Sequence, residues 1–161
     1  VEFCGLSVAG VSFWGNPFDI GPDGTQDNAI GQTWKRFGSL ASGFPGAFAP
    51  GDKAYELHVS HPETAKTGFR EVFVGREPAA GVDLPLALSL KWVPVATCAL
   101  ATLEGRDIVE GWDWLYGEWM RREGWTPGDW LLQVYDSRFR GLEPGKLEAS
   151  VIEAVIPVTR P

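Results

Sequence analysis

The segment DIVEGWDWLYGEWMRR, residues 107–122, is the most informative for the fold class, because it carries a clear helical pattern. Its apolar residues recur at spacings of three and four, which places them along one side of a helix. We expect this stripe to pack against a sheet whose strands lie before and after the helix. The stripe consists of Ile108, Val109, Trp112, Leu115, Tyr116 and Trp119.

The same order of elements, strand, helix, strand, strand, is predicted twice along the chain. Segments rich in Gly and Pro, which are typical of turns, separate these elements. The first repeat is expected to contain a strand at about 1–14, a helix at about 27–40 capped by Thr25 or Asp27, and strands at about 55–59 and 69–74. The second is expected to contain a β-rich run at about 88–103, the helix at 107–122, and strands at about 129–135 and 149–158.

Two such repeats, at about 1–76 and 86–161, can share one sheet. The sequence therefore predicts an α+β fold in which two β-α-β-β repeats form one antiparallel sheet, with two helices on one face and a ligand groove between them. A chain of 161 residues has the length of one ordinary domain. We therefore expect residues 1–161 to form a single domain.

The composition excludes several classes of protein. Fourteen basic and 21 acidic residues give a net charge of −7, whereas a nucleic-acid-binding surface needs a basic stripe. The longest nearly apolar stretch, at 93–103, is too short to span a bilayer. No signal-peptide pattern is visible in the first residues. We expect a cytoplasmic protein that contacts neither nucleic acid nor membrane directly.

Cysteine and histidine provide no sign of a metal or cofactor site. Cys4 and Cys98 are too few for a disulfide scaffold and are expected to be buried small apolar residues. His58 and His61 lie three apart in a predicted strand, so they face opposite sides and are not expected to share a metal. No phosphate loop, dinucleotide fingerprint or nucleophile elbow is present. No cofactor or metal is predicted.

The aromatic residues are unusually dense, and five of the eight Trp residues fall between residues 112 and 130. Such a cluster forms either a heavy core or the wall of a pocket. Glu118 lies off the apolar stripe, on a flank that would face the groove. It is either solvated and paired with Arg121 and Arg122, or it is a pocket carboxylate. The helical pattern leaves both interpretations open.

Six segments carry a resemblance to a known family. They are IGQTWKRF at 30–37, YELHV at 55–59, the strand at 69–75, WVPV at 92–95, LYGEW at 115–119 and the strand at 152–158. In this order they resemble the GyrI-like effector-binding domains, which also serve as ligand-sensing domains of AraC-type and multidrug-sensing regulators. The pattern is most similar to integron-cassette effector-binding proteins. The chain departs from the family at 120–122, where Met-Arg-Arg replaces the usual Leu-Pro.

The resemblance implies a domain that binds small, often cationic or aromatic, molecules. The family's functional glutamate lies in a Tyr-x-Glu-Trp segment, which corresponds to Glu118 here. A carboxylate enclosed by aromatic rings loses water, and a cationic ligand compensates for that loss. The predicted ligand-binding residues are Glu118, Trp34, Tyr55, Trp92, Trp114, Tyr116, Trp125 and Tyr135.

Three functions compete at this point. The first is an effector-binding module for hydrophobic cations or similar small molecules, without a DNA-binding segment of its own; a homodimer and a separate regulator protein are both open as partners. The second is a small-molecule hydrolase, in which Glu118 acts as general base on a water that attacks a strained or electrophilic substrate. The third, a gyrase-binding domain, rests on the family name alone.

Overall fold

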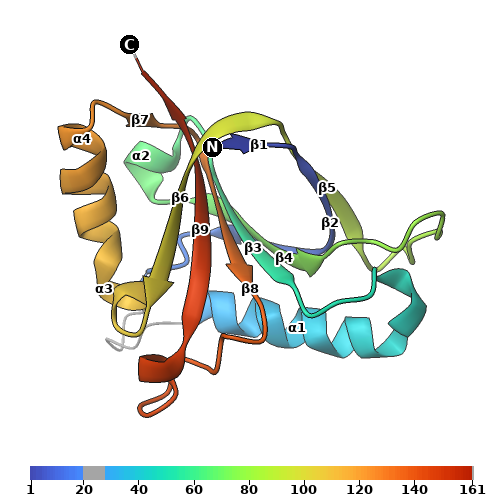
Figure 1. Cartoon of the computed structure of the whole chain (residues 1–161). Coiled ribbons are helices and arrows are strands. Elements are labelled where there is room, and N and C mark those ends of the chain that lie inside the picture. The colour runs from blue at the N-terminus through green and yellow to red at the C-terminus, as the bar shows by residue number, and fades with distance from the viewer. Residues whose placement is uncertain (20–27, 161) are drawn as a thin grey trace.

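The computed structural model describes residues 1–19 and 28–160, which form a curled antiparallel sheet with helices on its outer face (Figure 1). Within this part of the chain the strand order is β1-β6-β9-β8-β3-β4-β2-β5, and β7 pairs with β9 off this path. The strands are β1 (Glu2–Phe3), β2 (Leu6–Gly15), β3 (Ala54–Ser60), β4 (Arg70–Arg76), β5 (Ser89–Val93), β6 (Ala96–Glu104), β7 (Thr126–Pro127), β8 (Trp130–Tyr135) and β9 (Val151–Thr159). The helices are α1 (Ala29–Gly43), α2 (Thr64–Thr67), α3 (Asp107–Trp114) and α4 (Met120–Arg122), with the π-helical segment η2 (Leu115–Trp119) and the short turns η1 (Pro45–Ala47) and η3 (Leu147–Ala149).

Each half of the chain builds one half of the sheet, and the two halves have the same strand order when counted from the centre. The second half supplies the order β6-β9-β8, the first half supplies β3-β4-β2, and the two meet where β8 pairs with β3. Each half places its main helix after its first long strand. The predicted α+β fold with two β-α-β-β units in one antiparallel sheet is confirmed.

The observed elements differ from the predicted ones mainly where strands break. The expected first strand is split into β1 and β2 at Gly5, whose φ of 83° is accessible to glycine. The long run at 88–103 becomes β5 and β6, separated at Pro94. Helix α1 begins at Ala29, and Asn28 caps it, since Asn28 Oδ1 accepts a hydrogen bond of 2.9 Å from the Gly31 N–H. The predicted caps Thr25 and Asp27 lie outside the described residues.

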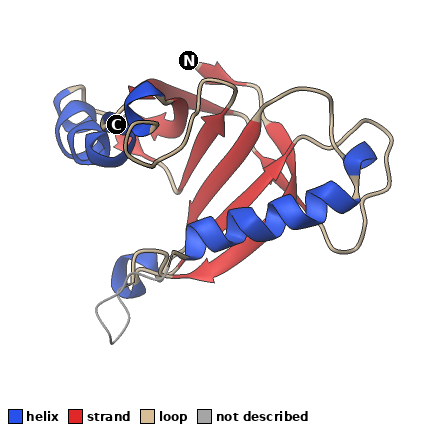
Figure 2. Ribbon diagram, turned by 90° about the horizontal axis from the view of Figure 1, so that it is seen from below, coloured by secondary structure: helices blue, strands red, loops and turns tan. Residues whose placement is uncertain are grey.

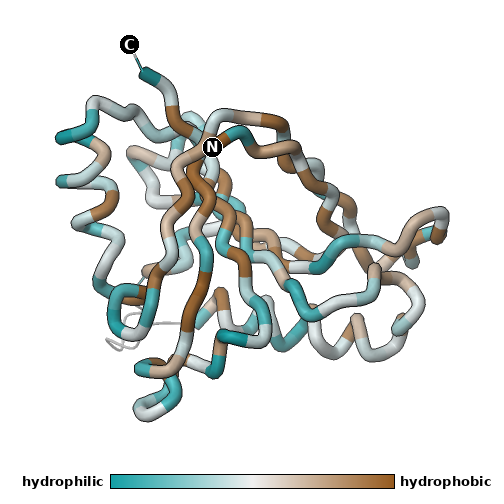
Figure 3. Tube along the Cα trace, in the orientation of Figure 1, coloured by the Kyte–Doolittle hydropathy of each residue, from teal (hydrophilic) through white to brown (hydrophobic). Residues whose placement is uncertain are grey.

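Apolar residues are concentrated in the strands (Figure 3), and their side chains pack on both faces of the sheet. One core fills the inside of the curl and contains Tyr55, Leu57, Phe73 and Leu132. The other side of the sheet packs against the helices. There Phe37 of α1 lies with Val72 and Val74, and Leu115 and Met120 lie with Ile156 and Val158. Because both helical layers cover the same face, the central strands between them carry the floor of any groove.

The second helix extends over the predicted 107–122, but it is not a regular α-helix throughout. The π-helical turn η2 interrupts the 3.6-residue period. The predicted apolar stripe is also not uniformly covered: Ile108 and Leu115 are buried, whereas Val109, which precedes this turn, is 58% exposed. No helix in the described ranges is long and apolar enough to cross a membrane.

The two cysteines lie in different environments. Cys98 is buried in the core inside the curl, as expected, and burial raises the pKa of its thiol. Cys4 is exposed, so the expectation that it is buried is wrong. The reason is its position at the break between β1 and β2, where the chain leaves the pairing with β6 before it joins β4 and β5.

Candidate functional site

A cavity of about 1320 Å³ lies between α1 and the rod formed by α3 and η2, over strands β3 and β8. The two helical layers are separated along the sheet, and Figure 2 shows α1 crossing the strands on one side of it. The walls come from both helices and from the segment after β8. They include Ile30 and Trp34 of α1, Ile108, Val109 and Trp112 of α3, Tyr116 of η2, and Phe139. The predicted groove between the helices is therefore present.

The floor of this cavity is polar, because alternate residues of β3 and β8 point towards the helices. Glu56 of β3 pairs in register with Gln133 of β8, and His58 pairs with Leu131. Side chains two residues apart in a strand share a face, so Glu56 and His58 lie together. Tyr55 lies on the opposite face, in the core inside the curl.

Glu56 is only 4% exposed, and three donors surround its carboxylate. The Trp34 Nε1–H donates to Oε2 at 2.6 Å, and His58 Nε2 lies 2.8 Å from Oε1. The Gln133 Nε2–H makes a longer contact of 3.5 Å with Oε1. The His58 contact is an ion pair when the imidazole is protonated and a hydrogen bond when Nε2 carries its only proton. Buried carboxylates need such partners, and here they come from α1, β3 and β8.

Two tyrosines add neutral donors to the cavity. The Tyr135 hydroxyl donates to Gln133 Oε1 at 2.8 Å, which extends the Glu56 cluster. Burial raises the pKa of Tyr135 well above its usual value, and the nearby Glu56 carboxylate raises it further. Burial also raises the pKa of Tyr116 to about 12, although the Arg70 charge opposes this shift. Both phenols therefore stay protonated at neutral pH.

Aromatic rings give the cavity a stiff wall. The Trp34 and Tyr135 ring centroids lie 5.6 Å apart at 75°, and those of Tyr135 and Phe139 lie 4.8 Å apart at 80°. Trp112 and Tyr116 form a further pair at 6.4 Å. The first two pairs are edge-to-face and hold one another in place, whereas the Trp112–Tyr116 pair is tilted at 32°. A planar or multi-ring molecule can therefore pack against preformed ring surfaces.

Three of the predicted ligand-binding residues line the cavity, namely Trp34, Tyr116 and Tyr135. The aromatic positions on α1, η2 and β8 thus meet around one space. Trp112, which its place in the apolar stripe favoured as a core residue, also lines it.

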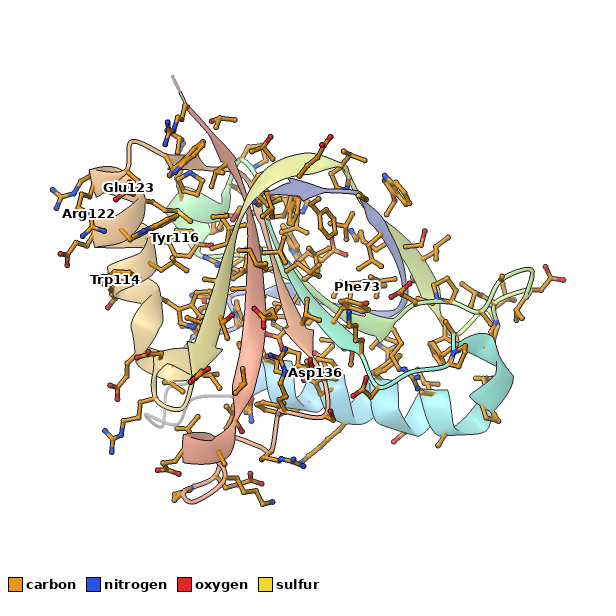
Figure 4. All side chains as sticks on the ribbon, viewed as in Figure 1. Phe73, Trp114, Tyr116, Arg122, Glu123 and Asp136 are labelled. Atoms are coloured by element: carbon orange, nitrogen blue, oxygen red, sulfur yellow. The ribbon has the colours of Figure 1, made fainter. Side chains whose placement is uncertain are left out.

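Glu118 and Trp114 do not line the cavity. Glu118 is exposed on η2, and Trp114 is 51% exposed at the end of α3. Figure 4 shows Tyr116 on the sheet-facing side of the rod and Trp114 on its outer side. The exposure of Glu118 agrees with the interpretation of this residue as a solvated side chain, but the ion pairs with Arg121 and Arg122 that this interpretation included are not found among the described residues, and Arg122 contacts Glu123 at 3.1 Å.

The remaining predicted residues lie elsewhere. The Tyr55 hydroxyl leaves the core inside the curl and donates to Glu77 Oε1 at 2.6 Å, away from the cavity. Trp92 is 60% exposed on the edge strand β5. Trp125 packs beneath Arg160, whose guanidinium carbon lies 4.0 Å from the ring centroid. Tyr55 points away from the cavity because it alternates with Glu56 along β3. Trp92 and Trp125 lie outside the cavity because they are at the edge or end of the fold.

The sequence interpretation missed the carboxylate that the cavity contains. A signal for it was present: Glu56 and His58 are two residues apart in an apolar strand, so both had to be buried on one face with partners. The spacing of His58 and His61, by contrast, places those two side chains on opposite faces of the strand. Among the described residues, no group of three or more His, Cys, Asp or Glu side chains is arranged to hold a metal ion.

Comparisons with known proteins agree with this arrangement at the level of the fold. No protein-family model matches the sequence, and no curated protein matches it significantly. Solved structures do match: the integron cassette protein VCH_CASS2 from the mobile metagenome of Vibrio cholerae has a TM-score of 0.64 at 16% identity, covering 99% of this chain and 94% of that one. The chain has the fold of this integron cassette protein. The C-terminal domain of EcmrR has a TM-score of 0.68 at 13% identity, with 100% and 96% covered. SAV2435 bound to tetraphenylphosphonium has a TM-score of 0.63 at 9% identity, with 99% and 92% covered. These structures are consistent with the predicted resemblance to GyrI-like effector-binding domains.

Proposed function

We propose that this domain binds small hydrophobic molecules with aromatic and cationic character in the cavity between α1 and the α3–η2 rod. The observation that carries the proposal is a buried carboxylate, Glu56, on the floor of a roomy cavity with aromatic walls. Cavities that bind drug-sized molecules are typically 300–1,000 Å³, mostly apolar, and contain a few placed polar groups. The cavity of about 1320 Å³ offers room for a ligand of several rings.

The roles divide between the rings and the carboxylate. Apolar contact with the walls contributes about 25 cal/mol for each Å² removed from water, whatever the ligand charge. A cation over an aromatic face gains about 0.5–2 kcal/mol more. Glu56 then selects for a cation or a hydrogen-bond donor, because its two oxygens are held in place by Trp34 and His58. In this proposal Glu56 takes the role that the sequence assigned to Glu118.

The structural comparison supports a ligand of this class. SAV2435 shares the fold and is described in complex with tetraphenylphosphonium, a bulky cation that carries four phenyl rings. A molecule of that kind combines the two features to which the present cavity is suited. We therefore propose tetraphenylphosphonium as the first probe for this domain.

The test compares two Glu→Gln variants of equal charge change. Binding of tetraphenylphosphonium is followed by tryptophan fluorescence and by calorimetry in wild type, Glu56→Gln and Glu118→Gln. A unit charge pair about 5 Å apart is worth about 3 kcal/mol at an effective dielectric constant of 20. Since Trp34 and His58 already contact the Glu56 oxygens, we expect a loss of about 1.4 kcal/mol, or tenfold in Kd, for Glu56→Gln.

Glu118→Gln serves as the matched control and should leave the affinity unchanged, because that side chain is exposed outside the cavity. The opposite result, with Glu118→Gln weakening binding and Glu56→Gln without effect, would return the ligand carboxylate to the position that the sequence predicted. Absence of binding by the wild type would contradict the proposed function itself.

A hydrolase is the second candidate, and the Glu56–His58 contact of 2.8 Å is the observation that favours it. A carboxylate oriented by an imidazole can accept a proton from water, while the Tyr135 phenol, protonated at neutral pH, can donate to the leaving oxygen. An epoxide such as 4-nitrostyrene oxide tests this, since water addition to the ring gives a diol. Turnover by wild type that is lost in Glu56→Gln supports hydrolysis; binding without turnover leaves the binding function alone.

The partner that responds to ligand binding stays a prediction. The sequence allows either a homodimer or a separate regulator protein as partner, and the two predict different behaviour in sedimentation. Sedimentation of the chain with and without tetraphenylphosphonium distinguishes a ligand-dependent dimer from a monomer that needs another protein.

A further inference from the structure

Arg70 is the charged group in the cavity that the proposed function does not use. It begins β4, where it pairs in register with Ser60 of β3 and with Gly15 of β2. It lies two residues before Val72, which packs on the helix-facing side of the sheet. By the period of two, Arg70 therefore points to the same side as Glu56 and His58. It lines the same cavity.

Among residues 1–19 and 28–160, no hydrogen bond or ion pair to the Arg70 guanidinium is found. Its Nε atom is buried without a hydrogen bond, and within residues 1–19 and 28–160 it is the single buried side-chain nitrogen or oxygen in that state. The ion pairs found in this part of the structure do not include Arg70. The Phe18 ring centroid lies 5.7 Å from its guanidinium carbon. Arginine has five fixed N–H donors, so most of its capacity is unused.

The acids of the described residues that line the same cavity do not pair with Arg70. Glu56 is held by Trp34 and His58. Asp129 is exposed and lies beyond Ser60, whose N–H donates to the Asp129 carbonyl oxygen at 2.7 Å. Glu143, also on the cavity lining, contacts Lys146 at 3.7 Å. In the described structure the cavity thus has a paired carboxylate in one part and an unpaired guanidinium in another.

We propose that Arg70 binds an anionic substituent, a carboxylate, sulfonate or phosphate, on the aromatic molecule that occupies the cavity. This inference rests on the proposed function, because it names a second group on the same ligand. Planar oxyanions match the guanidinium fork and form two short charge-assisted hydrogen bonds with it. Ser60, directly opposite Arg70, offers a hydroxyl to the same group.

The spacing of the two charged groups describes the ligand further. Glu56 lies four residues before Ser60 in β3, which corresponds to about 13 Å along the strand. A molecule with an anionic group at Arg70 and a donor or cation near Glu56 therefore needs two or three rings between them. The aromatic residues that line the cavity, among them Tyr116, Trp112 and Trp34, offer surfaces for such rings.

Two fluorescent probes with one skeleton test the proposal. 8-Anilinonaphthalene-1-sulfonate carries an anionic group, and N-phenyl-1-naphthylamine is the same molecule without it. Their affinities are measured in wild type, Arg70→Met and Arg36→Met, with competition by tetraphenylphosphonium to confirm binding in the cavity. Arg36 is exposed on α1 outside the cavity lining, so its variant controls for the loss of one positive charge.

We expect Arg70→Met to weaken binding of the sulfonate probe about tenfold and to change binding of the neutral probe less than twofold. Arg36→Met should change neither. Arg70→Lys, which keeps the charge and loses the fork, should give an intermediate affinity for the sulfonate, and thermal unfolding checks that each variant is folded.

Equal weakening of both probes in Arg70→Met would overturn the proposal, since Arg70 would then shape the cavity without recognising an anion. Unchanged sulfonate binding would overturn it as well. In both cases the neutral probe still binds in competition with tetraphenylphosphonium, so the proposed function stands. Failure of both probes and of tetraphenylphosphonium to bind the wild type contradicts the proposed function and this inference together.

Discussion

Trp34→Phe tests whether the indole N–H orients the cavity carboxylate. The substitution keeps an aromatic ring against Tyr135 and removes the 2.6 Å hydrogen bond to Glu56 Oε2. Glu56 is buried, and the other two partners of its carboxylate, His58 Nε2 at 2.8 Å and Gln133 Nε2 at 3.5 Å, both contact the other oxygen, Oε1. A hydrogen bond to a charged group contributes about 1.5–3 kcal/mol, so we expect the free energy of unfolding to fall by about 2 kcal/mol.

Thermal and urea unfolding measure this loss, and about 2 kcal/mol corresponds to roughly 4–8 °C in Tm for a domain of this size. A double-mutant cycle with Glu56→Gln separates the hydrogen bond from the smaller volume of the Phe ring. Because Gln still accepts a hydrogen bond without a charge, and charge-assisted bonds are about twice as strong, we expect a coupling of about 1 kcal/mol. Trp114→Phe, at a half-exposed position outside the cavity, is the control and should change stability by less than about 0.5 kcal/mol. Additive effects of Trp34→Phe and Glu56→Gln would refute the argument that these side chains act on each other.

Three further predictions follow from burial and close approach. Burial raises the pKa of all three tyrosines above the usual value of 10.0, that of Tyr116 to about 12. Absorbance at 295 nm should therefore show no tyrosinate in the folded protein at pH 10. The stability that the neutral phenols provide should be intact below pH 10 and should fall as the pH rises towards 12. Gly75→Ala should destabilise the protein by about 3 kcal/mol in urea unfolding, because a Cβ there would meet the Ala9 carbonyl oxygen at 2.1 Å, whereas Gly38→Ala in α1, with nothing within 4 Å, should stabilise it by about 0.5–1 kcal/mol. A thiol reagent should modify one cysteine in the native protein, the exposed Cys4, and two after unfolding releases Cys98; two fast-reacting native thiols would contradict the packing of the core.

The parts of the fold that sequence predicts are those with a strong local period. The helix at 107–122 and the order of strands and helices in each half were predicted, because apolar spacing is a property of adjacent residues. The breaks were not. Gly5 and Pro94 interrupt strands for reasons that involve the pairing of distant segments, and the π-helical turn at η2 changes which residues of the rod face inward.

The candidate site shows the same division. Trp34, Tyr116 and Tyr135 were predicted to line the pocket, and they do so from three separate elements. Glu118 was predicted from a resemblance over a short segment, and a short segment does not specify the direction of one side chain next to a π-helical turn. Glu56, in contrast, lines the cavity and was not predicted as a ligand-binding residue. The spacing of Glu56 and His58 indicates that the two share one face of β3, but Gln133 and Trp34 reach Glu56 only through the pairing of β3 with β8 and the position of α1.

A crystal structure of the domain with tetraphenylphosphonium tests the central claim most directly. If the claim is right, the cation occupies the space between α1 and η2, with phenyl rings against Trp34 and Trp112 and the phosphorus on the Glu56 side. Density for the cation on the outer side of the rod near Glu118, with the space over β3 and β8 filled by side chains, would contradict it.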